Sequence, residues 1–336
     1  MATIKDVARR AGVAPSTVSY ALSGKRTISA EARTKIAKII TELNFTPSKL
    51  GQRLAHGRSN MIGLVYPVRE VELEYESLDF LPGVDRLLHA NGYGLSLFTG
   101  LMTPQNVLDL YRNNTVDGLI IMQIDRSDPR VDILRDKGFP LTLIGRCNHT
   151  KGLTLVDFDA AHAAYLLFEN LHQLGHRVIG YLDHTVEVQQ QKYGYAWLVQ
   201  RGVEKAMKTF KPRVVVEHTT DRVESIYAAT CALLKREPAL TAIVTVRRMT
   251  PFGVLHALHD HGRRVPDDCA LVGITSSAYA EMSLPKLTSA DIPLNDMVRA
   301  GAELVLRQLT GKTQPQQVIF PARVINRAST APPSKR

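Results

Sequence analysis

Apolar residues recur at helical spacing in three short segments of the first 45 residues, with polar residues between them. This pattern predicts three short helices that share one small core. Gly12 supplies a left-handed stop after the first segment, Pro15 suits the first turn of the second helix, and Ser29 precedes the third. The apolar positions are Ile4, Val7, Ala8 and Ala11, then Val18, Ala21 and Leu22, and then Ala32, Ile36, Ile39, Ile40 and Leu43. Three such helices are typical of a helix-turn-helix domain.

From Met61 the pattern changes to short apolar runs that alternate with amphipathic segments. Strands that alternate with helices predict parallel sheets covered on both faces, and the number of runs suggests two such lobes. In such sheets, ligands bind beyond the carboxyl ends of the strands. The predicted strands are 61–66, 118–122, 140–144, 178–182, 213–216, 241–246 and 270–274. The predicted helices are 78–90, 107–113, 160–173, 225–235 and 252–261.

A helix of about two turns is predicted between Pro47 and Gly57, and a helix of that length is too short to be stable alone. The simplest interpretation is a linker between domains. A more specific hypothesis is a helix that orders when two copies of the chain pair on DNA, with Leu54 inserted into a minor-groove step.

The positive charge of the chain is concentrated at its N-terminal end. Residues 1–60 contain 11 Lys and Arg residues against 3 acidic ones, so they carry +8 of the total formal charge of +10. A head this basic on a nearly neutral body is typical of a module that binds a polyanion. Charge alone fits a solvated basic surface about equally well, so the assignment to DNA binding depends on the helix-turn-helix pattern.

Polar side chains on the second predicted helix are the candidate readers of DNA bases. In a helix-turn-helix domain this helix lies in the major groove, while surrounding cations hold phosphates. Arg26, in the following loop, suits either a guanine or a phosphate, and phosphate is the simpler assignment. The complete set of candidate DNA-binding residues is Thr3, Ser16, Thr17, Tyr20, Lys25, Arg26, Ser48, Lys49, Arg53 and Leu54.

Three runs of residues resemble a known family: TIKDVARRAGV, TVSYALSGKRTIS and LNFTPSKLGQRLA. They closely resemble the lactose and purine repressor family of bacterial transcription regulators, and the resemblance extends over almost the whole chain. It implies a homodimer that binds a palindromic operator in double-stranded DNA. It also implies hinge helices whose leucine, here Leu54, kinks the centre of that operator, and a core of two similar lobes joined by three crossovers.

We therefore expect a small all-α helix-turn-helix domain over 1–46, a hinge helix or linker over 47–58, and a core for ligand binding and dimerisation over 59–336. The core is expected to be an α/β structure of two doubly wound parallel-sheet lobes, similar to periplasmic binding proteins. The expected lobes are about 59–158 with 291–320, and about 159–290 with 321–330.

The chain departs from the family pattern at three positions of the DNA-binding segment. Ala14 replaces the usual polar cap of the recognition helix, Pro15 occupies a position often used to contact DNA, and Gly51 replaces a usual hinge alanine. These departures leave the operator sequence and affinity open, although not the class of protein.

Further departures fall where the family binds its effector. Relatives have Asn-Asp or Gly-Asp where this chain has Arg247-Arg248, and Gln191 replaces a frequent arginine. Arginines at strand ends suit carboxylate or phosphate groups through forked hydrogen bonds. This predicts an anionic effector, such as a sugar acid or sugar phosphate, bound by Arg146, Gln191, Arg247, Arg248 and Thr275. The alternative is that these arginines are solvated, or paired with Asp183 or Glu187, in a pocket that has drifted or closed.

Other classes of chemistry lack their motifs. The three cysteines form no CxxC pair, and the run His256-Ala-Leu-His259-Asp-His261 is more simply a solvated helix end than a metal site. The sequence has no GxSxG elbow, no P-loop, and no GxGxxG in a first βαβ unit. We therefore expect no enzyme activity, no metal and no cofactor.

Two rival functions remain at this stage. One is a sugar-binding or carbohydrate enzyme domain without DNA activity, which the basic head argues against. The other is a regulator that acts as an activator or needs its ligand as corepressor, because the sign of the coupling depends on which lobe geometry the ligand favours. We expect a dimer, since no heptad helix follows Ala331, and a cytoplasmic, nucleoid-associated protein without a membrane segment.

Overall fold

The computed structural model describes residues 2–23, 28–45, 58–67, 78–135, 137–184, 193–220, 222–247, 250–311 and 314–334. The chain divides into two compact units, Met1–Asn60 and Met61–Arg336, which are described separately below.

The first unit contains the three predicted helices, α1 (Ile4–Ala11), α2 (Pro15–Ser23) and α3 (Ala30–Glu42). Thr3 caps α1 in a capping box with Asp6, whose pKa is lowered by the hydrogen bond that it accepts from the Thr3 side chain. Gly12 ends α1 with a φ of 70°, a conformation that glycine adopts without strain. The buried core side chains are Val7, Ala8, Ala11, Val18, Ile36, Ile39 and Phe45. The helix predictions for this unit are confirmed.

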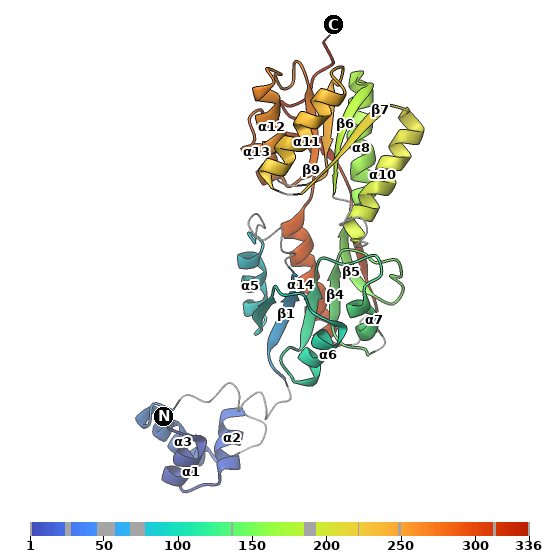
Figure 1. The fold of residues 1–336 in the computed structure, drawn as a ribbon. Coiled ribbons are helices and arrows are strands. Elements are labelled where there is room, and N and C mark those ends of the chain that lie inside the picture. The colour runs from blue at the N-terminus through green and yellow to red at the C-terminus, as the bar shows by residue number, and fades with distance from the viewer. Residues whose placement is uncertain are drawn as a thin grey trace. The chain divides into compact units, whose positions relative to one another are not determined.

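The second unit contains two six-stranded sheets, one in each of two lobes (Figure 1). The first sheet is entirely parallel, in the order β11-β5-β4-β3-β1-β2. Helices α5 and α14 pack on one of its faces, and α6 and α7 pack on the other. Its strands are β1 (Met61–Val65), β2 (Gly94–Phe98), β3 (Gly118–Ile121), β4 (Leu141–Ile144), β5 (Thr154–Phe158) and β11 (Gln317–Phe320). Its helices are α5 (Leu81–Ala90), α6 (Pro104–Arg112), α7 (Pro129–Arg135) and α14 (Leu294–Thr310).

The second sheet has the order β12-β10-β9-β8-β6-β7 and is parallel except for the antiparallel pair of β10 with β12. Helices α8 and α10 cover one face, and α11 and α12 cover the other. Its strands are β6 (Val178–His184), β7 (Arg213–Thr219), β8 (Ala242–Thr245), β9 (Ala270–Thr275), β10 (Thr288–Asp291) and β12 (Val324–Ile325). Its helices are α8 (Ala160–Leu174), α10 (Gly194–Phe210), α11 (Val223–Arg236), α12 (Thr250–Asp260) and α13 (Ser277–Met282).

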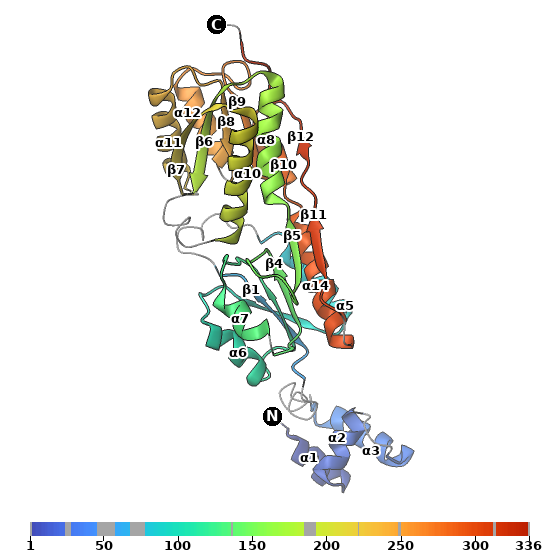
Figure 2. The same ribbon diagram turned by 90° about the vertical axis from the view of Figure 1, so that its right-hand side faces the viewer.

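The chain passes between the two lobes three times, after β5, after β10 and after β11 (Figure 2). The predicted class of two parallel α/β lobes is confirmed, and each predicted strand and helix of the core has a counterpart. Five strands and four helices of the described residues were not predicted. These are β2, β5, β10, β11 and β12, and α7, α10, α13 and α14.

A buried histidine holds the C-terminal segment against the second lobe. The Nε2 atom of His176 lies 2.9 Å from the carbonyl oxygen of Ala331, and its Nδ1 atom lies 3.0 Å from the hydroxyl of Thr241. A carbonyl only accepts, so Nε2 carries a proton, and in the neutral ring Nδ1 accepts from the hydroxyl. Burial lowers the pKa of His176, because a charged imidazolium would lose its hydration.

Because of His176, we expect the free energy of unfolding to decrease in mild acid. The folded state keeps the ring neutral to a lower pH than the unfolded chain, which takes up a proton below about pH 6.5. The free energy of unfolding should fall between pH 7 and pH 5, by at most about 1.4 kcal/mol per pH unit for this one proton. Urea unfolding across that range should show a shallower dependence for His176→Gln than for the exposed control His259→Gln. Equal dependences in the two variants would contradict this role of His176.

Candidate functional site

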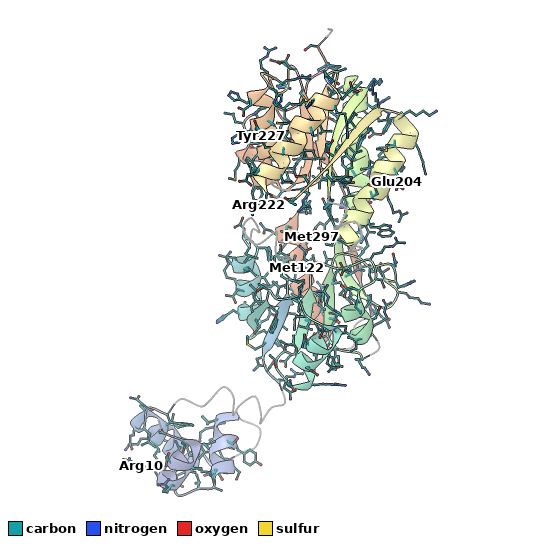
Figure 3. All side chains as sticks on the ribbon, viewed as in Figure 1. Arg10, Met122, Glu204, Arg222, Tyr227 and Met297 are labelled. Carbon is teal, nitrogen blue, oxygen red and sulfur yellow. The ribbon has the colours of Figure 1, made fainter. Side chains whose placement is uncertain are left out.

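The surface of the helical unit presents the predicted DNA contacts that the structure describes. Ser16 on α2 is exposed, Thr17 and Tyr20 are half-buried on the same helix, and Thr3 is exposed at the start of α1. Arg10, labelled on this unit in Figure 3, lies 3.5 Å from Glu42 in an exposed pair. Further exposed cations on α1 and α3 are Lys5, Arg9, Arg33, Lys35 and Lys38. The other candidates, Lys25, Arg26, Ser48, Lys49, Arg53 and Leu54, lie outside the described residues.

The second unit contains a cavity of about 540 Å³ between its two sheets. Strands of both sheets end at this cavity, as expected for ligand sites in parallel α/β structures. Residues at or just after the carboxyl ends of strands line it from both sides. They are Tyr66, Met122, Gln123, Gly145 and Phe158 in the first lobe, and His184, Val246, Arg247, Thr275 and Asp291 in the second.

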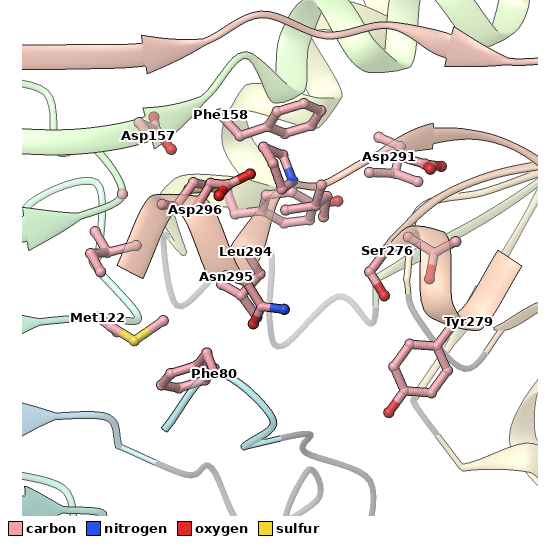
Figure 4. Close-up of a pocket in the computed structure, with 18 of the residues that line it drawn as sticks. Phe80, Met122, Asp157, Phe158, Ser276, Tyr279, Asp291, Leu294, Asn295 and Asp296 are labelled. Carbon is pink, nitrogen blue, oxygen red and sulfur yellow. The ribbon is translucent and has the colours of Figure 1, made fainter. Parts of the chain in front are cut away.

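The third side of the cavity is the first turn of α14, which follows the crossover after β10. Leu294, Asn295 and Asp296 lie there between side chains of the two lobes (Figure 4). Met297 from this turn and Met122 from the first lobe are both labelled at the level of the junction in Figure 3. The cavity is therefore built by both lobes and by a segment that connects them.

Aromatic rings form much of the cavity wall. Tyr66 and Phe80 pack edge to face with ring centroids 5.9 Å apart. On the opposite lobe, the hydroxyl of Tyr195 donates a 3.0 Å hydrogen bond to the carbonyl of Val246, which fixes the ring. The remaining aromatic lining residues are Phe158, Tyr193 and Tyr279. Aromatic faces of this kind suit the apolar faces of a ring-shaped ligand.

The described residues that line the cavity include four carboxylates: Asp79, Asp157, Asp291 and Asp296. Burial raises the pKa of Asp157, and its ion pair with Arg146 opposes that effect. Asp291 lies 2.9 Å from Arg327 and also accepts hydrogen bonds from the hydroxyls of Ser277 and Ser289. Carboxylate oxygens only accept hydrogen bonds when ionised, so they suit ligand groups that donate, such as hydroxyls.

The predicted effector residues have different positions relative to the cavity. Arg247 and Thr275 are buried and line it, and the hydroxyl of Thr275 has no hydrogen-bond partner among the described residues. Arg146 does not line the cavity. It forms an ion pair with Asp157, which does line it. Gln191 and Arg248 lie outside the described residues. Asp183, considered as a partner of these arginines, accepts from the Tyr181 hydroxyl at 3.0 Å and from the His184 amide at 2.7 Å.

Sequence reasoning did not identify the aromatic and acidic lining residues. Phe158 ends a strand that was not predicted, and Asp296 lies in the first turn of a helix that was not predicted. A search for polar or aromatic residues just after each apolar run would have found Tyr66 and Gln123. Asp79 and Phe80 lie within the predicted helix 78–90, whereas α5 begins only at Leu81, and nothing in the local pattern marks these two residues as facing a cavity.

The described residues contain no group of three or more His, Cys, Asp or Glu side chains placed to hold a metal ion. Within those same ranges, none of the helices combines the length and the apolar character needed to span a bilayer. His261, from the histidine-containing run, places its Nδ1 atom 2.8 Å from the carbonyl of Ala257 in its own helix end.

Comparisons with known proteins agree with both units. Residues 3–48 match the family model described as bacterial regulatory proteins, lacI family, and residues 168–330 match that of a periplasmic binding protein-like domain. The HTH-type transcriptional repressor PurR of Proteus mirabilis (strain HI4320) is 27% identical over 338 residues, which cover 98% of this chain and 97% of that protein.

Two solved structures are similar over nearly the whole chain. A complex of the transcriptional regulator CelR with cellobiose has a TM-score of 0.70 and 26% identity, and the match covers 98% of this chain and 100% of that one. The lac repressor dimer bound to operator and the anti-inducer ONPF has a TM-score of 0.82, 21% identity, and coverage of 98% and 99%. The latter likeness shows the fold alone. The matched proteins are transcriptional regulators and not enzymes, and the chain belongs to the lacI family of bacterial regulatory proteins as a DNA-binding transcriptional regulator.

Proposed function

We propose that the chain is a repressor that binds a palindromic operator as a homodimer and is released by a small carbohydrate-related effector. One observation carries the proposal: a cavity built jointly by both lobes and their connecting segment lies in the same chain as a basic helix-turn-helix unit. Effector binding in such a cavity favours one lobe orientation over another. That preference is the coupling that a ligand-controlled regulator needs.

Exposed apolar side chains support a homodimer. Leu97 and Leu101 are 37% and 75% exposed in the first lobe, and Met282 and Leu284 are 70% and 89% exposed in the second. Exposed apolar side chains favour association where they form a continuous patch. The relative from Proteus is named a repressor, and the lac repressor structure is described as a dimer on its operator. Both names support repression by a dimer for this chain.

The cavity favours a neutral, hydroxyl-rich effector. Among its described lining residues there are four carboxylates and one guanidinium, that of Arg247. Asp157 and Asp291 are neutralised by Arg146 and Arg327, which lie outside the lining, so the support for a neutral ligand is that carboxylates accept hydrogen bonds from sugar hydroxyls. The aromatic walls supply faces for a sugar ring, and the similar CelR structure is described as a complex with cellobiose.

The anionic effector expected from the sequence is the second candidate. Buried Arg247 supports it, because a guanidinium binds carboxylate and phosphate groups through two parallel hydrogen bonds. The first turn of α14 also directs the positive end of a helix at the cavity, although Asp296 lies in that turn. Arg146 supports it less, because it is already paired with Asp157.

A thermal-shift panel of neutral sugars, sugar acids and sugar phosphates separates the two candidates. A ligand present at 100 times its Kd stabilises the folded protein by about 2.7 kcal/mol, which raises the melting temperature measurably. We expect neutral sugars to produce the shift and the acids to produce none. The reverse pattern would contradict the neutral candidate and support the anionic one. Asp296→Asn should reduce the shift by a neutral sugar and enhance that by an acid.

Each compound that shifts the melting temperature is then tested on a protein–DNA complex. The full-length chain first selects duplexes from a random pool, and enrichment of a palindrome is the expected result. An effector of a repressor should release the selected duplex. Tighter binding of the duplex would instead indicate a corepressor, and a shift in melting temperature without any enriched duplex would indicate a sugar-binding protein without DNA activity.

A further inference from the structure

The two lobes contact each other through backbone groups beside the cavity. The amide of Gly194, the first residue of α10, donates a 3.0 Å hydrogen bond to the carbonyl of Ile124 in the other lobe. Asp125 and Tyr193 form an antiparallel β-bridge next to it. The N-terminal end of α10 lies against the first lobe in both views of the fold (Figures 1 and 2). These contacts join the loop after β3 to the start of α10.

Gly194 is required by the closeness of this contact. A Cβ atom on Gly194 would lie 2.5 Å from the carbonyl oxygen of Arg146 and 2.8 Å from that of Ile124. Both distances are far below van der Waals contact, and both neighbours are backbone atoms that cannot rotate away. The start of α10 therefore packs backbone to backbone on the first lobe.

A side-chain contact extends the junction. The guanidinium of Arg126, from the first lobe, lies 5.0 Å from the ring centre of Trp197 on α10. Arg201, from the same helix as Trp197, lies 5.1 Å from that ring. Cation–π contacts at such distances are attractive. Only the contact of Arg126 crosses between the lobes, because Arg201 and Trp197 share α10.

The loop that makes these contacts also lines the cavity. Gln123, the residue before Ile124, is a lining residue and has a φ of 53°, which is uncommon for a residue with a side chain. Its carbonyl accepts a 2.9 Å hydrogen bond from Arg130, whose guanidinium forms a buried pair with Asp128 at 2.6 Å. Asp128 also accepts from the amide of Asp125 at 3.2 Å. This pair fixes the loop from the cavity to the interlobe contact.

We propose that Ile124, Asp125 and Arg126 form an interlobe latch with Tyr193, Gly194 and Trp197, and that the latch couples the cavity to the orientation of the lobes. Gln123 and Tyr193 both line the cavity; Gln123 is next in sequence to Ile124 of the latch, and Tyr193 is itself part of the latch. A bound effector therefore acts on the latch through immediate neighbours, with Asp128 and Arg130 as positioning residues. This inference rests on the proposed function, because its readout is DNA affinity.

The two arginines beside Trp197 provide a matched test in the full-length chain without effector. Arg126→Met removes a contact between the lobes together with an exposed 3.0 Å hydrogen bond to Asn148 within the first lobe, whereas Arg201→Met removes a ring contact of similar distance within α10. Loss of the first should change the affinity for the selected duplex by about two- to fivefold, the effect of one cation–π contact, and loss of the second should leave it unchanged. Trp197 is the single tryptophan of the sequence, so its emission reports whether the junction itself has changed.

A reversible disulfide across the latch, called the lock below, shows whether the latch raises or lowers the affinity for the selected duplex. The paired backbone positions of Asp125 and Tyr193 place their Cα atoms about 4.5–5.5 Å apart, as in any antiparallel bridge, which suits a disulfide. In the variant Asp125→Cys/Tyr193→Cys, oxidation should shift duplex affinity in the direction opposite to Arg126→Met, and a reductant should reverse it. Wild-type protein treated in the same way controls for Cys147, Cys231 and Cys269.

Three outcomes overturn the latch. They are equal duplex affinities of the Arg126→Met and Arg201→Met variants, a lock that shifts affinity in the same direction as Arg126→Met, and a lock without effect although the disulfide has formed. Failure of the wild-type chain to select any duplex is a different result, since it removes the proposed DNA function itself and the latch proposal with it.

Discussion

Raising the salt concentration from 50 to 200 mM is expected to weaken binding of the full-length chain to DNA by about 10³-fold or more. Residues 1–60 carry +8, and a homodimer brings two such segments to one duplex. Each phosphate neutralised by a lysine or arginine releases a condensed counterion, and the release becomes less favourable as salt rises. Anisotropy titrations of a labelled duplex at several salt concentrations give the slope of log affinity against log salt.

The control for this prediction is the chain without residues 1–57, which should show no salt-dependent binding. The comparison of the selected palindrome with a scrambled duplex separates the two parts of the affinity, since phosphate contacts act on both duplexes while base contacts act on one. A truncated chain that binds with the slope of the full-length protein would place the DNA surface on the core. It would thereby remove the role assigned to Ser16, Thr17 and Tyr20.

Arg327→Met is expected to lower the free energy of unfolding of the core by about 3 kcal/mol or more, the usual cost of removing one partner from a buried ion pair. The Arg327 side chain is only 8% exposed and lies 2.9 Å from Asp291 and 2.7 Å from Glu281. It also donates to the Ser289 hydroxyl at 2.7 Å and to the Leu287 carbonyl at 2.9 Å. Its loss leaves Asp291 without its cation at the edge of the cavity. Urea unfolding of the two proteins measures the difference.

Arg299→Met is the matched control. Arg299 lies 3.5 Å from Asp296 in a pair whose side chains are 63% and 59% exposed. Exposed pairs of this kind contribute about 0–1 kcal/mol, so this variant should unfold almost like the wild type. If both variants lowered the free energy of unfolding by a similar amount, the contribution of Arg327 to stability would not depend on its burial. Because Asp291 lines the cavity, Arg327→Met should also alter effector binding, whereas a purely structural arginine would change stability alone.

The helical unit could be predicted almost completely because its signals are local. Thr3, Gly12, Pro15 and Ser29 each mark an end of a helix through their own backbone preferences. The core strands with continuous apolar runs were found for the same reason, since a strand buried on both faces needs no periodicity to be recognised.

The strands that escaped prediction contain polar residues whose partners are distant in sequence. The strand β5 includes Asp157, which is paired with Arg146, and β10 reads Thr-Ser-Ala-Asp. Thr288 in β10 is buried, and its backbone amide is satisfied there by a 2.8 Å hydrogen bond to the Ser329 hydroxyl, 41 residues away in sequence. Local patterns cannot show that such polar groups will be satisfied, so these segments do not look like strands.

The same limit applies to the candidate site. The strand ends that line the cavity followed from the predicted parallel sheets, and they led to Arg247 and Thr275. The aromatic wall and the carboxylates did not follow, because Phe80, Asp296 and Tyr279 come from three segments that only the crossovers bring together. The number of acidic side chains among the described lining residues, which supports the proposed neutral effector, is therefore a property of the fold rather than of any one motif.

The three crossovers also determine when this protein can fold during its synthesis. The first lobe begins at β1 but receives its helix α14 and its edge strand β11 only from residues 294–320. Until those residues leave the ribosome, the apolar face that α14 covers has no partner, while the whole second lobe has already been made. Nascent chains therefore expose an incomplete sheet for most of translation, and demand for chaperones should rise with the length of that interval.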